Sequence, residues 1–211
     1  MRLIYSLSIA LLACNLCTAQ HDTAKCPPEG KSNSGTVRYV NSLINRDIVK
    51  GKVDSAINLD TLLRGGADDT GRFSPAKFVT VTGWVVEAED IGPQSCNCFS
   101  KDSSQWGMQV YLATSLGAWK DSIMVVELTP KYRAIHHFSS EGLFEEKIKV
   151  SGYLMFNHEA KKFSLNACKK CHTTDRKTAW EIAPVTDLVI MPKPEKAKKP
   201  SKDSGDNKKK Q

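Results

Sequence analysis

Between residues 78 and 191 the apolar residues gather in five runs that are rich in β-branched and aromatic side chains. Runs of this kind, bounded by residues typical of turns, predict β-strands. Pro130 ends the third run, because proline cannot donate a hydrogen bond to a neighbouring strand. The predicted strands are FVTVTGWVVEAE (78–89), WGMQVYLAT (106–114), IMVVELT (123–129), KIKVSGYLMFN (147–157) and AWEIAPVTDLVIM (179–191).

A short helix is predicted between the third and fourth strands. Ser139 or Ser140 can cap its N-terminus, since a serine hydroxyl accepts a hydrogen bond from a free backbone N–H of the first turn. The helix would hold Leu143 and Phe144. A connection of this kind is expected where the chain must cross from one edge of a barrel to the other.

The five strands and the helical connection follow the plan of the OB-fold, a five-stranded Greek-key barrel. Gly83 and Gly152 stand in the middle of the first and fourth strands, where glycine relieves crowding in a sharply coiled strand. The prediction is a mostly β protein with an OB-like barrel over residues 76–192. Residues 20–75 are weakly patterned and form an N-terminal extension, with a short helix capped by Asp60.

The first residues, MRLIYSLSIALLACNLCTAQ, have the layout of a secretory signal peptide. A positive residue is followed by an apolar run that is too short for a permanent membrane span, and small residues precede Gln20. Residues 1–19 are therefore expected to be removed on export. A lipoprotein signal with Cys14 as the lipidated residue is the alternative. Both interpretations predict a protein exported to the periplasm or the cell surface.

Residues 193–211 form a Lys-rich tail with eight lysines against three acidic residues. The tail lacks large apolar side chains and is expected to be disordered. Its net charge of +5 makes up most of the +7 of the whole chain, which leaves the body close to neutral. The tail is a solubilising segment or, alternatively, adheres to anionic lipid, cell-wall polymer or nucleic acid.

Four segments resemble a group of small bacterial proteins of unknown function with a predicted OB-like barrel: GWVVEAEDIGPQSCNC, VVELTPKYR, VSGYLMF and AWEIAPVT. The resemblance spans roughly residues 78–190, and its strongest items are the Ser-Cys-Asn-Cys loop and the Trp-Glu-Ile-x-Pro-Val-Thr strand. The pattern of the group has two histidines where this chain has Gln109 and Ala183, which puts a role for those positions in doubt here. The resemblance implies the barrel and no activity.

Five cysteines follow the signal segment, and four of them lie in two barrel loops, at Cys96, Cys98, Cys168 and Cys171. In an exported protein, paired thiols are normally oxidised. The two loops could meet at one rim of the barrel and be cross-linked. Such a bridge would close a loop of about 70 residues, which stabilises the fold by on the order of 4 kcal/mol in the chain-entropy model. Cys26 would then be the odd cysteine.

Two other chemistries remain open for these cysteines. Four thiolates, or three with His172, could form a closed zinc site. Cys168-x-x-Cys171-His172 is also the attachment signature of covalent haem c, with His172 as the proximal ligand. The polar loop around it, with Lys169 and Lys170, supplies little of the apolar surface that a haem needs.

An OB barrel binds linear ligands across one face with aromatic and basic side chains. The candidates for such a face are Trp84, Tyr111, Tyr153 and Trp180 with Lys131 and Arg133. The alternative is that these aromatic residues belong to the core. Nucleic acid is a less expected ligand, because a body near neutral charge lacks the basic footprint of a nucleic-acid binder.

The remaining candidates for chemistry are two carboxylates and one histidine cluster. Glu127 lies in an otherwise apolar strand and Glu181 follows Trp180; the pair could do acid–base work or point to water. His136 and His137 near Glu141 are expected to be solvated.

We therefore expect a non-enzymatic binding module of the cell envelope with a structural four-cysteine site, held by disulfides or zinc. Its ligand is unidentified, with an envelope polymer, an anionic lipid or another protein as candidate partners. Association with a membrane would be peripheral or through a lipid on Cys14. The alternative function is a c-type haem electron carrier.

Overall fold

The structure is a computed structural model that describes residues 26–65, 69–119, 122–168, 170–171 and 174–193 of the 211-residue chain. The predicted signal peptide with Cys14, the tail beyond Lys193, and Lys169 and His172 lie outside the described residues. No helix of the described part is long and apolar enough to cross a membrane.

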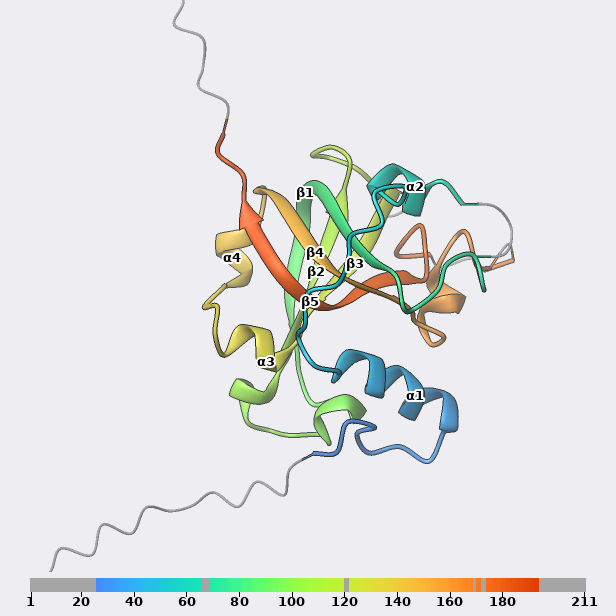
Figure 1. The fold of residues 1–211 in the computed structure, drawn as a ribbon, viewed down its shortest axis with the longest axis vertical. Coiled ribbons are helices and arrows are strands. Elements are labelled where there is room, and N and C mark those ends of the chain that lie inside the picture. Colours follow the sequence, from blue (N-terminus) through green and yellow to red (C-terminus); the bar gives the residue numbers. More distant parts are fainter. Residues whose placement is uncertain (1–25, 66–68, 120–121, 169, 172–173, 194–211) are drawn as a thin grey trace, which may run out of the picture.

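Five strands form a closed barrel in the order β1-β2-β3-β5-β4 (Figure 1), which confirms the predicted mostly β, OB-like architecture. The pairing of β3 with β5 is parallel and the others are antiparallel. The strands are β1 (Phe78–Ile91), β2 (Gly107–Ala113), β3 (Ile123–Leu128), β4 (Lys147–Phe156) and β5 (Trp180–Ile190).

Side chains alternate across each strand, so one set fills the barrel and the other faces outward. Met108, Val110 and Leu112 of β2 belong to the central hydrophobic core, whereas Tyr111 and Ala113 belong to a separate outer cluster. A β-bulge after Val85 lets the long strand β1 pair with both β2 and β4.

Glycine is required at the two mid-strand positions by close approach. A Cβ on Gly83 would lie 2.7 Å from Leu59 Cδ2 and 2.9 Å from the carbonyl oxygen of Ala113. A Cβ on Gly152 would lie 2.5 Å from the carbonyl oxygen of Pro184. A side chain at either place would push neighbouring elements apart.

Short helices fill the connections. Two of them, α3 (Pro130–Arg133) and α4 (Ser140–Leu143), join β3 to β4, and the Ser139 hydroxyl caps α4 as one of the two alternatives predicted. Leu143 lies in the helix and is buried in the core, whereas Phe144 is the residue that follows the helix and is half exposed. The helix ends at Leu143, and Phe144 already has an extended ψ of 133°. The loops hold the 3-10 turns η1 (Ser95–Asn97), η2 (Ser103–Gln105) and η4 (Ala160–Phe163).

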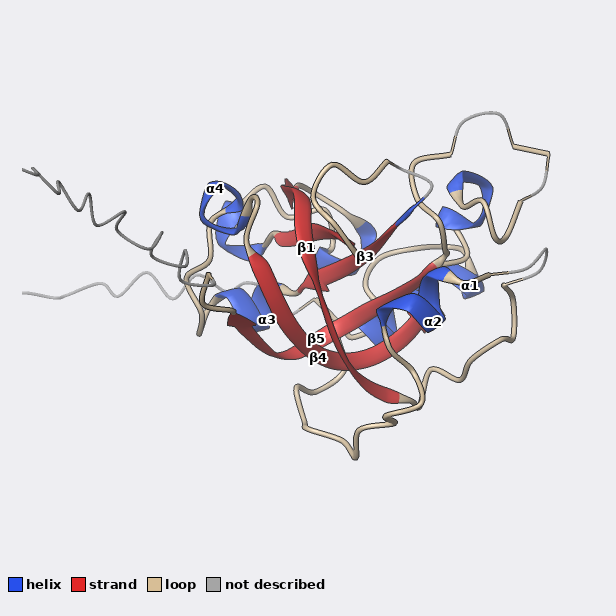
Figure 2. Ribbon diagram, turned by 90° about the horizontal axis from the view of Figure 1, so that it is seen from above, coloured by secondary structure: helices blue, strands red, loops and turns tan. Residues whose placement is uncertain are grey.

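The segment before the barrel adds α1 (Gly35–Ile44) and α2 (Leu59–Leu63). They lie to the right of α3 and α4 in both views (Figures 1 and 2). The side chain of Asn58, and not the predicted Asp60, caps α2. Arg46, just after α1, donates hydrogen bonds to the carbonyl oxygens of Leu154 (3.1 Å) and Ala183 (2.7 Å), which fixes α1 against β4 and β5.

Candidate functional site

The structure pairs the cysteines differently from the sequence-based expectation. Cys26 and Cys98 form a disulfide with a Cα separation of 5.7 Å, and Cys168 and Cys171 form a second one with 5.5 Å. Among the cysteines of the described residues, Cys96 is the one with a free thiol. The expectation that Cys26 would be odd, and that bridges would join the two barrel loops, was wrong.

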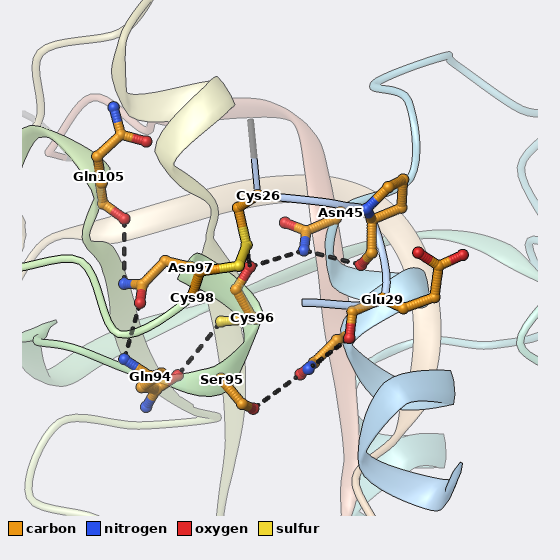
Figure 3. Close-up of a disulfide and its surroundings, with 11 residues drawn as sticks. Cys26, Glu29, Asn45, Gln94, Ser95, Cys96, Asn97, Cys98 and Gln105 are labelled. Carbon is orange, nitrogen blue, oxygen red and sulfur yellow. Dashed lines mark hydrogen bonds between the residues drawn. A yellow bond between two sulfur atoms is a disulfide. The ribbon is translucent and has the colours of Figure 1, made fainter. Parts of the chain in front are cut away.

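Contacts of the N-terminal segment explain this pairing. The backbone N–H of Lys31 donates to the carbonyl oxygen of Ser95 at 2.8 Å, and the side chain of Asn45 donates to the carbonyl oxygens of Cys96 and Pro28 at 2.9 and 3.0 Å. Figure 3 shows the hydrogen bonds of Asn45 beside the disulfide that joins Cys26 to the loop between β1 and β2. The loop cysteine Cys98 is therefore paired with Cys26 and not with a cysteine of the 168–171 loop.

A zinc site on four cysteines is not formed in the described part of the chain. No group of three or more His, Cys, Asp or Glu side chains there could hold a metal ion. Covalent haem would be attached through the sulfur atoms of Cys168 and Cys171, and these two atoms are joined in a disulfide. His172 lies outside the described residues.

The six residues of the predicted ligand face are spread over different surroundings. Trp180 is inside the barrel, 1% exposed, and its indole N–H donates to the carbonyl oxygen of Asp69. The ring of Tyr153 lies under the guanidinium of Arg46, and Trp84 is 5.7 Å from the Lys147 ammonium.

The other three members of that set are held by hydrogen bonds. The Tyr111 hydroxyl donates to Glu89 at 2.7 Å. Lys131 donates to the carbonyl oxygen of Asn45, and Arg133 pairs with Asp90 at 2.9 Å. Trp180 cannot take part in an outer face, and both cations already have partners.

A hollow lies between the outer face of the barrel and the N-terminal segment. It has a volume of about 680 Å³, and we call it the α1 pocket. Its lining comes from four places, which are the N-terminal segment with α1, the loop after β1, strands β2 and β3, and the start of the loop after β4. The lining includes apolar, polar and charged side chains: Lys31, Val37, Val40, Ile44, Gln94, Cys96, Gln109, Glu127, Asn157 and Glu159.

The strand register places Glu127 in this pocket. Gln109 of β2 is the direct neighbour of Glu127 on β3 and of Glu89 on β1. These residues point outward because Met108, Val126 and Leu128 fill the barrel. The Glu127 side chain is nevertheless buried, 3% exposed, because the N-terminal segment covers this face.

Glu127 and Glu181 are two buried carboxyls with unequal surroundings. Glu181 accepts hydrogen bonds from Arg176 and from Asn157, the latter at 3.0 Å, both at Oε1, while its Oε2 is buried without a described hydrogen-bond partner. The Glu127 carboxyl instead lines the α1 pocket. Burial raises the pKa of Glu127 to about 8, with a smaller contribution from the charge of Glu181. Burial also raises the pKa of Glu181, against the opposing effect of Arg176.

The free thiol of Cys96 faces the same pocket. Burial, together with the charge of Glu127, raises its pKa to about 12, so Cys96 is a neutral thiol at physiological pH. Its sulfur lies 3.6 Å from Gln94 Oε1 (Figure 3). A nucleophilic role for this cysteine is therefore not supported by its surroundings.

The sequence pointed to part of this site and missed the rest. Glu127 and Glu181 stood out as carboxylates in apolar strands, and that placement was the signal for their burial. Arg176 and Asn157 lie in loops with no distinguishing pattern. The predicted histidine cluster takes no part, since the His136 ring packs on Tyr132 with centroids 4.4 Å apart, away from the α1 pocket lining.

No model of a known protein family matches this chain, and no curated protein matches it significantly. The closed five-stranded barrel supports the fold that the resemblance to the bacterial group implied. Neither membership of that group nor its sequence motifs gain support from the comparisons. Of the two positions at which the group has histidine, Gln109 lines the α1 pocket and Ala183 is buried against Val40 and Ile44.

Proposed function

We propose that this chain is an exported, non-enzymatic binding module of the cell envelope, and that its ligand occupies the α1 pocket. The observation that carries the proposal is the Glu127 carboxyl, which is buried in the fold and lines a pocket of about 680 Å³. Ligand pockets combine apolar walls with a few polar groups that orient the ligand, and a buried carboxyl on the lining fits that role.

The location of the pocket supports a binding role. Ligands of OB-folds lie on the face of strands 2 and 3, between the loops that follow strands 1 and 4. The α1 pocket is bounded by β2, β3 and the same two loops. Its volume falls in the range of small-molecule sites, roughly 300–1,000 Å³.

The two disulfides support a location outside the reducing cytoplasm. The signal-like N-terminal sequence points the same way. Export is tested by the intact mass of the chain recovered from the cell envelope. A mass that begins at Gln20, with no addition, supports cleavage by signal peptidase, and a lipid mass on Cys14 supports anchoring. The same mass and a visible spectrum test the haem alternative, since one covalent haem would add its own mass and a Soret band.

Binding is tested with a library of small soluble fragments and NMR of the side-chain amides of Gln109 and Asn157. We expect a subset of fragments to shift these signals in the wild-type protein. Val40→Trp, which fills the pocket, should abolish the shifts. Val49→Trp, at a position that is 61% exposed and outside the pocket lining, is the matched control and should retain them. A pocket that no fragment enters would overturn the proposal.

A further inference from the structure

We propose that the α1 pocket selects a small organic ammonium, whose charged nitrogen is held by Glu127 and whose apolar body lies along α1. This inference rests on the proposed function, because it names the ligand class of the same pocket.

The charge of the pocket floor favours a cation. Three charged residues line the pocket, and two of them, Lys31 and Glu159, are exposed at its rim. The third, Glu127, is buried, and the groups that act on it are Glu181 and Arg176. Of these two groups Arg176 is the cation, and it is already paired with Glu181 and, at 3.2 Å, with Asp175. At the pocket floor a bound anion would meet the Glu127 carboxyl and no free cation, since Lys31 lies at the exposed rim.

The hydrogen-bonding groups beside Glu127 suit an ammonium. An ammonium carries three N–H donors and no acceptor, so it needs several acceptors around it. Glu127 offers two carboxyl oxygens, and the amide oxygens of Gln109 and Gln94 line the same pocket. The Gln94 amide oxygen accepts a contact from Cys96, and the Gln109 amide oxygen lies 3.2 Å from the Tyr111 hydroxyl, which donates its proton to the nearer Glu89. An amide oxygen has two lone pairs, so both can accept from a ligand.

The walls of the pocket favour an organic cation over a metal ion. Val37, Val40 and Ile44 of α1 give the pocket an apolar wall. A bare metal ion would not cover this wall, which would stay in contact with water. A calcium ion takes 6–8 oxygen ligands and magnesium demands an octahedral set. No group of three acidic, cysteine or histidine side chains in the described residues could hold a metal ion. An alkyl or aryl group attached to the ammonium would instead cover the apolar wall.

The protonation of Glu127 gives this binding a measurable signature. With a pKa of about 8, the Glu127 carboxyl is mostly protonated at pH 7. An arriving ammonium favours the ionised form, because an opposite charge within hydrogen-bonding distance lowers the pKa of a carboxyl. Binding at pH 7 should therefore release about one proton per site, whereas binding of a neutral molecule should release none.

The test uses the exported chain from Gln20 and three probes of equal length, hexylammonium, hexanol and hexanoate, in calorimetric titrations in two buffers of different ionisation enthalpy. We expect hexylammonium to bind roughly ten- to a hundredfold more tightly than hexanol, the range expected of a charge-assisted hydrogen bond. Hexanoate should not bind. Proton release of about one per site should accompany hexylammonium alone.

Two matched variants separate the inference from the proposed function. Glu127→Gln keeps the shape of the side chain and should remove both the preference for hexylammonium and the proton release, with hexanol binding unchanged. Glu159→Gln removes a carboxylate from the rim of the same pocket and should change the affinity less than about threefold, as expected of an exposed charge. Thermal unfolding of each variant verifies that it folds.

Equal binding of hexanol and hexylammonium, unaffected by Glu127→Gln, would overturn the ammonium inference and leave the pocket as a binding site. If none of the three probes bound, the ammonium inference would fall as well. The proposed function would then be decided by the fragment library and Val40→Trp.

Discussion

Arg176 pairs with Glu181 inside the protein, and neither side chain is more than 6% exposed. The two residues are five positions apart, one in the loop before β5 and the other near the start of that strand. Glu127 on β3 is buried nearby without a cation of its own. Of the two carboxyls on this face, one is thus part of the fold and the other is left to the pocket.

Removal of Arg176 should destabilise the protein strongly. Arg176→Met leaves the Glu181 carboxylate buried without its counter-ion, which typically costs about 3–5 kcal/mol of unfolding free energy. The double variant Arg176→Met/Glu181→Leu should recover much of the loss, because no buried charge remains. Urea unfolding at pH 7 measures both. Lys77→Met, which breaks a pair with Asp54 at the surface, is the control and should cost less than about 1 kcal/mol. Equal losses in the single and double variants would contradict this explanation.

Glu127 should make the unliganded protein less stable as the pH rises. Its pKa in the folded protein is about 8 and its ordinary value is 4.5. Between these values the unfolded chain releases a proton that the folded protein retains, so stability falls from about pH 4.5 to pH 8 and is constant above. The difference of about 3.5 units corresponds to up to about 5 kcal/mol, at 1.36 kcal/mol per unit.

Urea midpoints at pH 5, 7 and 9 should therefore diverge between the wild type and Glu127→Gln. The variant should gain in relative stability with rising pH, because its amide does not ionise. Parallel pH profiles of the two proteins would show that the Glu127 carboxyl is ionised or well solvated in the folded state.

The disulfide between Cys26 and Cys98 should contribute more stability than the one between Cys168 and Cys171. The first closes a loop with a sequence separation of 72 and the second one of 3. The chain-entropy model gives about 4 kcal/mol for the former and about 2 kcal/mol for the latter. The double serine variants at each pair, compared by urea unfolding, test this order. Hydrogen exchange should quicken in α1 only when Cys26 and Cys98 are replaced.

Cys96 should resist alkylation in the folded protein. A neutral thiol with a pKa of about 12 has almost no thiolate at pH 8, and the thiolate is the reactive form. Iodoacetamide should modify Cys96 in urea and leave it unmodified without urea, as measured by peptide mass mapping. A cysteine introduced at Lys101, an exposed position of the same loop, should react under both conditions. Rapid labelling of Cys96 in the native protein would show that the α1 pocket opens readily.

The strands could be predicted from the sequence and the site largely could not. The run from Ile123 to Thr129 matches β3 to within a residue, since consecutive β-branched residues favour strands locally. The burial of Glu127 depends instead on a segment more than 80 residues away that covers the outer face of β3. The pairing of Cys98 could not be predicted for the same reason, since its partner Cys26 lies in the weakly patterned segment before α1. The sequence left open whether Trp180 lies in the core or on an outer face, because the alternation of side chains along a strand shows that one face is buried but not which one.

The bond from Cys26 to Cys98 also changes what a protease could do to this protein. Residues 46–77 connect α1, which lines the pocket, to the first strand of the barrel, and Val49 and Val53 in that connection are exposed. A cut there would divide the backbone in two, yet the fragment that carries α1 would remain covalently attached to the barrel through the two sulfurs. Such a nicked protein should migrate as one species until it is reduced, and it should keep its pocket closed without an intact chain.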